Sequence, residues 1–318
     1  MYHTVEEDSR KYTAFVVPNG HFEFLRMPFG LCTSPAYFQK YINAVFHDLM
    51  MERVVAVYMD DLIVPSVNIQ EGLSRLKLVF KTAAKSGIVF NCKKCQLLKT
   101  KVNYLGYMIE NGKIAPSEEK TDAVRHFPKP TNVRAVQSFL GLTGYFRKFI
   151  PQYAHIARPL TDLLKKEAKF KFGEEQERAF NQFKLALSDK SILRIYCPTA
   201  ETELHTDASA RGFGAILLQR DNESRIFHPV YYASGKTTSV EAKYDSYKLE
   251  VLAIVKALKK FRVYLIGISF TIVTDCKAFM QTMKKKEVCA QVARWAFFLE
   301  DFKYSIVHRP GNSDTWML

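Results

Sequence analysis

The sequence has no long hydrophobic run, and its few cysteines do not suggest a disulfide-stabilised protein. No apolar stretch approaches the ~20 residues that a helix needs to span a bilayer. The acidic segment Met1–Asp8 has no apolar core of the kind found in signal peptides. The six cysteines are scattered along 318 residues, a length that does not need covalent cross-links. We therefore expect free thiols and an intracellular protein (cytoplasmic or nuclear), not secreted and without a membrane partner.

Acidic residues are scarce relative to basic ones. The chain contains 46 Lys and Arg but 32 Asp and Glu, which gives a formal net charge of +14 and a pI near 9.4. Such an excess raises the electrostatic potential toward polyanions, of which nucleic acid is the commonest. A basic surface that only keeps the protein in solution explains the charge almost as well. The length accommodates two or three domains, and a hydrophobic fraction of 47% is typical of a globular protein.

The stretch Tyr58-Met59-Asp60-Asp61 combines two adjacent acids with apolar, β-branched runs on both sides. These runs, 54–59 and 62–64, predict two strands joined by a tight turn. Two aspartates at a rigid turn repel each other and need a counter-charge, and a divalent metal such as Mg²⁺ suits carboxylate oxygens. A solvated Asp-Asp turn is the alternative, and for an isolated pair it is the better interpretation.

Residues 1–112 form the first predicted domain, in which helices pack on an antiparallel sheet. Ser34 followed by Pro35 predicts the start of a helix that extends to about Met50. A second helix is expected over 69–86, where Gly87 ends it. The remaining expected strands of this domain are 12–17, 22–25, 88–91 and 102–109.

The middle domain, residues 113–196, is predicted to be helical. Thr131 or Asn132 can cap a helix whose apolar residues recur at spacings of three and four. Further helices are expected over 156–166 and 174–187. We interpret the aromatic stripes of these helices as core rather than as base-stacking surfaces. Basic residues of this segment can follow a phosphate backbone, although a solvated face explains them almost as well: Arg147, Lys148, Lys165, Lys166, Lys169 and Lys171.

The last predicted domain, residues 197–318, has the pattern of a mixed α/β unit with a twisted sheet. One long helix carries apolar residues at helical spacing from Tyr247 to Leu265. The expected strands are 204–209, 212–219, 227–233, 268–275 and 304–308.

Three acids of the last domain occupy positions that can converge. Asp207 and Asp275 close two expected strands, and Glu250 shares a helix face with Tyr247 and Ile254. A carboxylate cluster of this kind binds paired Mg²⁺ ions, which activate a water and stabilise the leaving oxygen in phosphodiester hydrolysis. Three unrelated surface acids are the alternative, and periodicity alone does not exclude it.

Together these motifs resemble the reverse transcriptase–ribonuclease H region of a gypsy/Ty3-type retrotransposon polyprotein. The resemblance covers almost the whole chain, and seven motifs occur in the family's order. The first four are Met27-Pro28-Phe29-Gly30-Leu31 with Phe38-Gln39 (nucleotide pocket), Tyr58-Met59-Asp60-Asp61 (palm hairpin), Tyr104-Leu105-Gly106-Tyr107 (primer grip), and Phe139 to Ile150 (thumb). The last three are Thr206-Asp207-Ala208-Ser209, Glu250-Val251-Leu252-Ala253 and Thr274-Asp275 (ribonuclease H carboxylates).

The resemblance implies a multidomain α+β and α/β fold: a palm with partial fingers, a helical thumb or connection, and a ribonuclease H-like mixed five-stranded sheet. It implies Mg²⁺ (or Mn²⁺) as cofactor, with RNA, DNA, RNA–DNA hybrid and dNTP as partners. Asp60, Asp61, Asp207, Glu250 and Asp275 are the implied catalytic and metal-binding residues. The implied substrate-binding residues are Phe29, Gly30, Gln39, Tyr58, Met59, Leu105 and Gly106.

The family also has two further aspartates that this sequence does not match. One lies in a palm strand just before the segment resembling Tyr2-His3, and the other follows a motif like 308–311, where Asp314 comes too early. We therefore expect the polymerase site of this chain to be incomplete. The alternatives are a catalytically silent nucleic-acid-binding protein and, less favoured, an interaction module with no affinity for hybrid. The oligomeric state is open.

Overall fold

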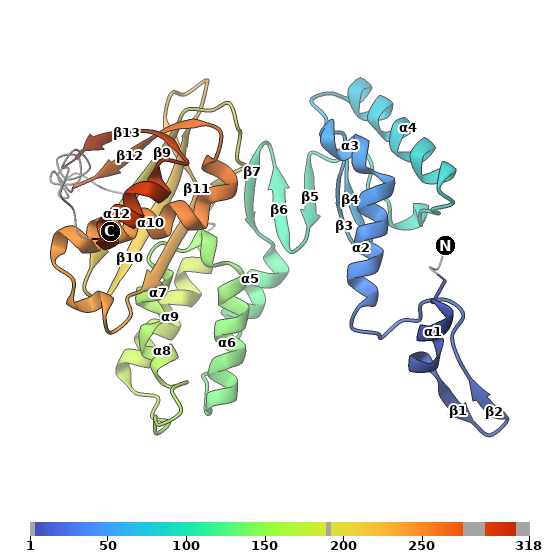
Figure 1. Ribbon diagram of the computed structural model, residues 1–318, viewed down its shortest axis with the longest axis horizontal. Coiled ribbons are helices and arrows are strands. Elements are labelled where there is room, and N and C mark those ends of the chain that lie inside the picture. The colour runs from blue at the N-terminus through green and yellow to red at the C-terminus, as the bar shows by residue number, and fades with distance from the viewer. Residues whose placement is uncertain (1–3, 189–191, 276–289, 310–318) are drawn as a thin grey trace. The chain divides into compact units, whose positions relative to one another are not determined.

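The structure is a computed structural model that describes residues 4–188, 192–275 and 290–309 (Figure 1). The chain forms two compact units, Met1–Thr100 and Lys101–Leu318. Residues 101–112, which the sequence analysis assigned to the first domain, pack within the second unit. The division into three domains at 112 and 196 stays a prediction, and Asp314 lies outside the described residues.

The first unit contains two small antiparallel hairpins and a helical layer. Its elements are α1 (Glu7–Arg10), η1 (Lys11–Thr13), β1 (Phe15–Val17), β2 (Gly20–Phe22), α2 (Ser34–Val45), α3 (His47–Met51), β3 (Ala56–Tyr58), β4 (Asp61–Ile63), α4 (Ile69–Lys85) and η2 (Cys92–Lys94). Proline stands in the first turn of α2, where its missing N–H costs nothing. Ile42 and Phe46 from the helical layer pack with Val79 and Ala83 of α4 in one buried cluster.

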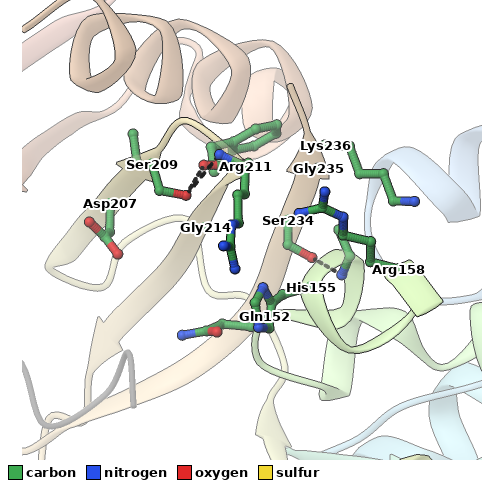
Figure 2. Close-up of a pocket in the computed structure, with 14 residues that line it drawn as sticks. Gln152, His155, Arg158, Asp207, Ser209, Arg211, Gly214, Ser234, Gly235 and Lys236 are labelled. Carbon is green, nitrogen blue, oxygen red and sulfur yellow. Dashed lines mark hydrogen bonds between the residues drawn. The ribbon is translucent and has the colours of Figure 1, made fainter. Parts of the chain in front are cut away.

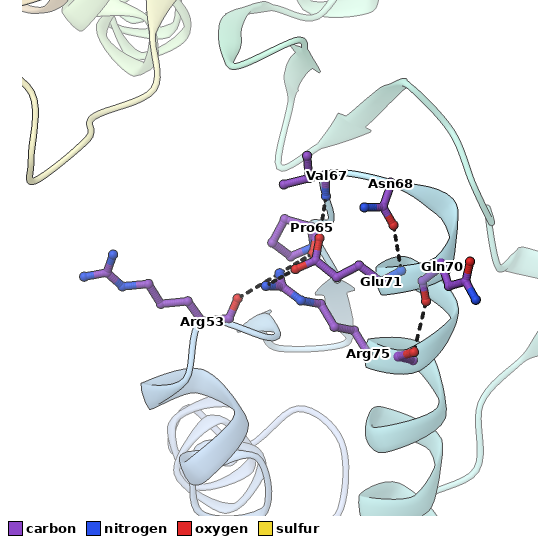
Figure 3. A network of polar contacts seen from close by, with 8 residues as sticks. Arg53, Pro65, Val67, Asn68, Gln70, Glu71 and Arg75 are labelled. Atoms are coloured by element: carbon purple, nitrogen blue, oxygen red, sulfur yellow. Dashed lines mark hydrogen bonds and ion pairs between the residues drawn. The ribbon is translucent and has the colours of Figure 1, made fainter. Parts of the chain in front are cut away.

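A polar network fixes the start of α4 (Figure 3). Asn68 Oδ1 accepts a hydrogen bond from the Glu71 N–H at 2.9 Å, and the Glu71 carboxylate accepts one from the Val67 N–H at 2.8 Å. Together these bonds satisfy two backbone donors in a reciprocal cap. Arg75 pairs with Glu71 at 2.7 Å and donates to the Pro65 carbonyl at 2.5 Å. The network therefore ties the segment after β4 to the helix.

The second unit begins with a four-stranded antiparallel sheet in the order β5-β6-β7-β8, followed along the chain by helices. Its strands are β5 (Lys101–Tyr104), β6 (Tyr107–Glu110), β7 (Lys113–Pro116) and β8 (Leu193–Arg194); its helices are α5 (Glu118–Arg125), α6 (Val133–Tyr145), η3 (Arg147–Phe149), α7 (Tyr153–Ile156), α8 (Arg158–Asp162) and α9 (Glu174–Ser188). Phe139, Phe146, Phe149 and Phe183 are fully buried in its core. The prediction that the aromatic stripes are core is confirmed.

A five-stranded mixed sheet completes this unit, in the order β11-β10-β9-β12-β13. Its elements are β9 (Thr202–Ser209), β10 (Gly212–Arg220), β11 (Phe227–Lys236), η4 (Glu241–Lys243), α10 (Ser246–Leu265), β12 (Ser269–Thr274), α12 (Ala290–Leu299) and β13 (Lys303–His308). The first three strands are antiparallel neighbours, whereas β12 runs parallel to both β9 and β13. Helix α10 packs its apolar side against the sheet through Val251, Ile254, Leu258 and Phe261.

The expected multidomain fold class is confirmed, but several element boundaries were wrong. The helix expected over 35–50 is interrupted at Phe46, whose φ of −101° and ψ of 11° are not helical. Residues 88–91 form no strand, 102–109 form a hairpin instead of one strand, and the helix expected over 156–166 is two short helices. Helix α12 was not predicted. In the described part of the chain, every helix is too short or too polar to cross a membrane.

Candidate carboxylate sites

The two aspartates of the first unit lie at the tip of the β3–β4 hairpin. Tyr58 pairs with Asp61 across the strands, so Met59 and Asp60 form a two-residue loop. Met59 adopts a left-handed backbone with φ of 51°, which is typical of such a turn. Its N–H donates to Gln39 Oε1 at 2.5 Å, so a side chain of α2 supports the turn directly. Both carboxylates are exposed to solvent and available to a ligand.

The predicted nucleotide-pocket residues lie in the loop before α2 and at its first turns. Ser34 Oγ donates to the Pro28 carbonyl at 3.0 Å, and the Ser34 N–H donates to the Leu31 carbonyl at 3.1 Å. These bonds hold the loop that presents Phe29, whose side chain is 90% exposed, and Gly30. Among the predicted substrate-binding residues of this unit, Gln39 and Met59 are in direct contact through a hydrogen bond. Tyr58 stands beside them in β3 and is half exposed.

Leu105 and Gly106 form the turn of the β5–β6 hairpin in the second unit. Both have positive φ, 49° and 71°, and a glycine adopts that conformation without the strain of a side chain. Tyr145 at the end of α6 donates its hydroxyl hydrogen to the Leu105 carbonyl at 2.7 Å. The Tyr145 ring also stacks on Tyr107 with ring centroids 5.3 Å apart. The turn is therefore held by the helix behind it.

Three carboxylates of the second unit converge on one end of the five-stranded sheet. Asp207 lies near the end of β9, and Asp275 follows the last residue of β12 directly. Because β9 and β12 are parallel neighbours, their carboxyl ends meet at the same edge. Glu250 reaches this edge from the second turn of α10, the helix that packs along β9. The structure thus places the three acids that the sequence singled out at the same edge of the sheet.

The electrostatics of Glu250 show how closely the three acids interact. Burial, together with the negative charges of Asp275 and Asp207, raises the pKa of Glu250 to about 8. A hydrogen bond from the Ala208 backbone N–H opposes this rise. Glu250 is only 6% exposed, and within the described residues its Oε2 atom has no hydrogen-bond partner. At neutral pH the isolated carboxyl is therefore mostly protonated, and a cation would ionise it.

The donor set fits a hard divalent cation in its chemistry, because it consists of carboxylate oxygens, one of them buried and unsatisfied. Across residues 4–188, 192–275 and 290–309, however, no three His, Cys, Asp or Glu side chains are already close enough to hold an ion. Asp207 and Asp275 are exposed, whereas Glu250 is buried. The ring of His308 adds a further polar atom here, with Nε2 3.0 Å from the Asp275 carbonyl oxygen.

Similarity to known proteins identifies the chain. Residues 2–109 match the family described as "Reverse transcriptase (RNA-dependent DNA polymerase)", and residues 197–302 match the "RNase H-like domain found in reverse transcriptase". The chain is 36% identical over 317 residues to the "Retrovirus-related Pol polyprotein from transposon 297" of Drosophila melanogaster, covering 99% of this chain and 29% of the relative. It belongs to the reverse transcriptase–ribonuclease H family of gypsy/Ty3-type retrotransposon polyproteins.

Other relatives of this reverse transcriptase–ribonuclease H chain support the same assignment. It is 34% identical to the "Transposon Tf2-3 polyprotein" of Schizosaccharomyces pombe, over 95% of this chain and 23% of the relative. The chain thus spans about a quarter of the length of these curated relatives. Among solved structures, the foamy viral protease–reverse transcriptase shares its fold. The TM-score is 0.83 for the dRH form with double-stranded DNA and 0.82 for the complex with RNA/DNA hybrid.

The dRH form is 23% identical to this chain, and the match covers 96% of this chain and 54% of the foamy viral chain. The hybrid complex is 24% identical, and the match covers 98% of this chain and 43% of the foamy viral chain.

One set of basic residues in this retroelement chain was not predicted from the sequence motifs. A pocket beside Asp207 is lined by His155, Arg158, Arg211 and Lys236, which come from helices and strands far apart in sequence (Figure 2). No local spacing links these side chains, so sequence patterns alone do not reveal the pocket. The excess of positive charge was its only signal.

Proposed function

We propose that Asp207, Glu250 and Asp275 bind a divalent cation, Mg²⁺ or Mn²⁺, and hydrolyse the RNA strand of an RNA–DNA hybrid. The observation that carries the proposal is the convergence of these carboxylates from β9, α10 and β12 at one sheet edge. The similar foamy viral structures are complexes with double-stranded DNA and with RNA/DNA hybrid, which supports nucleic acid as the partner. The A-form shape and 2′-hydroxyls of the hybrid are the features that a protein can recognise.

Each of the three acids has a separate part in this proposal. A bound Mg²⁺ would supply an activated water and stabilise the leaving oxygen in phosphodiester hydrolysis. Glu250 would lose its proton on ion binding, since its raised pKa reflects buried negative charge that a cation neutralises. The exposed Asp207 and Asp275 would supply further carboxylate ligands to the ion, and the Ala208 N–H would hold the glutamate in place.

We also propose that Asp60 and Asp61 bind metal in nucleotide addition by the polymerase palm. The support is a rigid turn that exposes both carboxylates and is braced by Gln39. Phe29, Gly30, Tyr58 and Met59 would contact the incoming dNTP, and Leu105 and Gly106 would contact the primer.

An intracellular, reducing location is part of the same proposal. Cys32, Cys92 and Cys95 are free thiols in the structure, as expected where disulfides do not persist.

A cleavage assay tests the hydrolytic proposal. Purified chain is incubated with Mg²⁺ or Mn²⁺ and one of three labelled duplexes: RNA–DNA hybrid, double-stranded RNA or double-stranded DNA. We expect cleavage of the RNA strand in the hybrid alone, and its loss in Asp275→Asn. Hybrid binding without cleavage at any metal concentration would favour a silent nucleic-acid-binding protein instead.

A further inference from the structure

Two segments of the second unit that are distant in sequence, residues 147–162 and the end of β11 at residues 234–236, meet beside Asp207 along a contact that we call the seam. The Ala154 N–H of α7 donates to Ser234 Oγ of β11 at 2.9 Å, and Arg147 Nη2 donates to the Ser234 carbonyl at 2.8 Å. Lys236 at the end of β11 bonds Thr161 Oγ1 and lies 3.7 Å from the Asp162 carboxylate of α8. These contacts fix the two sides of the seam relative to each other.

The seam encloses a pocket of about 100 Å³ (Figure 2). On the helical side His155 and Arg158 line it, and on the sheet side Arg211 and Lys236 do so. Asp207 of the carboxylate cluster also lines the wall, so the pocket lies beside one residue of the candidate hydrolytic site. A larger hollow of about 540 Å³ shares His155, Arg158 and Arg211 and continues along α8 and α9, where its lining is both acidic and basic.

The positive charge of the pocket is only partly neutralised. Asp162 is shared among three cations, with Lys165 at 3.1 Å, Lys236 at 3.7 Å and Arg158 at 3.9 Å. A single carboxylate cannot balance three cations, and the longest of these contacts leaves Arg158 weakly held. Arg211 is exposed in the β9–β10 turn, and no ion pair to it occurs among the described residues. The pocket therefore retains charge for an anion, and guanidinium groups suit phosphate oxygens.

The backbone leaves room for such an anion beside Asp207. Gly214 pairs with Asp207 across β9 and β10, and open space surrounds the position where its Cβ would be. Gly235 has the opposite constraint, since a Cβ there would meet the Phe213 ring. Glycine at position 235 therefore leaves room for the Phe213 ring, which lies over its cross-strand partner.

We propose that this seam pocket binds a backbone phosphate of the RNA strand adjacent to the bond that is cut. The proposal rests on the proposed hybrid cleavage, because Asp207 would then act on the same strand that the pocket holds. Arg158 and Arg211 would bind the phosphate from the two sides of the seam, and Lys236 would add positive charge beside His155. The pocket would in this way set the position of the strand relative to the carboxylates.

The test combines charge removal on the protein with charge removal on the nucleic acid. Hybrid binding by the parent chain is compared with Arg158→Gln/Arg211→Gln, with Arg211→Gln alone, and with the matched control Arg225→Gln. Arg225 is an exposed arginine in the turn at the opposite end of β10 and β11. Each protein is titrated with hybrids whose RNA strand carries one uncharged methylphosphonate linkage, moved one position at a time across the cut.

In the parent and in Arg225→Gln, we expect one linkage position to weaken binding about tenfold and to lower the salt slope by about 0.9. In Arg158→Gln/Arg211→Gln, a methylphosphonate at that position should not weaken binding further, because the arginines that would contact this phosphate have been replaced. An equal loss at the same position in parent and double variant would overturn the seam site while leaving hybrid cleavage intact. A parent chain that neither binds nor cleaves hybrid would overturn the proposed function and the seam site together.

Discussion

Among the residues of the carboxylate cluster, Glu250 has the most unusual environment. It is buried, and the negative charges of Asp275 and Asp207 disfavour its ionisation. Among the described residues, the hydrogen bond from the Ala208 N–H favours its charged form. Removing a carboxylate from water without a cation is unfavourable, so the proton stays on the side chain. The fold thus places at position 250 a carboxyl group that a bound metal ion would cause to ionise. Both the stability of the apo-protein and its metal affinity should then depend on pH.

The first prediction concerns the pH dependence of stability without metal. Because the pKa of Glu250 is about 8 in the folded state and near 4.5 when unfolded, the unfolded state loses its proton first. The free energy of unfolding should therefore fall as pH rises from about 5 to 8, by roughly 3 kcal/mol. Chemical denaturation in the presence of a chelator measures this fall.

The matched variant is Glu250→Gln, which keeps the shape but not the titration. Its unfolding free energy should be nearly flat over this pH range and higher than the parent value at pH 8. Adding Mg²⁺ should recover stability in the parent and not in the variant. A parent curve that is flat in chelator would show that Glu250 does not retain its proton.

At the scale of elements, the β3–β4 hairpin depends on a neighbouring helix. Two strands of three residues are marginal alone, and the left-handed Met59 adds strain to the turn. The bond from the Met59 N–H to Gln39 of α2 compensates for part of this. Gln39 is in turn oriented by Asn43, whose Oδ1 accepts from Gln39 Nε2 at 2.7 Å. Placement of the two aspartates is thus coupled to α2.

The second prediction tests this coupling. Gln39→Leu removes the acceptor for the Met59 N–H, and we expect the hairpin to lose roughly 1 kcal/mol of local stability. Amide hydrogen exchange at Met59 should accelerate by about fivefold. The control Asn43→Ala removes the orienting bond but leaves Gln39 in place, so it should accelerate exchange less. Equal exchange in Gln39→Leu and the parent would mean that the turn does not need α2.

Elements with strong local signals could be predicted from the sequence. The Asn132 cap of α6 is confirmed by its bond from the Ala135 N–H at 2.8 Å, and the order of the strands in the last domain agrees with the periodic pattern. The break at Phe46 could not be predicted, because the apolar spacing continues across it and Phe46 is buried in the same cluster as Ile42. The seam pocket arises from contacts between residues 75 and 80 positions apart, which no local sequence pattern predicts.

At the scale of the whole molecule, the excess of positive charge is the dominant property. A net charge of +14 on 318 residues attracts polyanions over distances longer than any single contact. Binding of hybrid should therefore release counterions, and affinity should depend steeply on salt.

The third prediction is that the logarithm of hybrid affinity falls linearly with the logarithm of salt concentration. The slope should be roughly −0.9 for each phosphate neutralised, by analogy with B-form DNA. Fluorescence anisotropy between low and moderate salt measures it. A slope indistinguishable from zero would remove nucleic acid as the partner, because a protein of this charge cannot bind a duplex without displacing cations.

The central claim is that one carboxylate cluster of this chain, and not the hairpin aspartates, cleaves RNA in a hybrid. The most direct measurement compares cleavage rates of three isosteric variants, Glu250→Gln, Asp275→Asn and Asp60→Asn, at saturating Mg²⁺. We predict that Glu250→Gln and Asp275→Asn lose at least a hundredfold in rate, since each removes a metal ligand, whereas Asp60→Asn cleaves like the parent. Equal cleavage by Glu250→Gln and the parent would contradict the account.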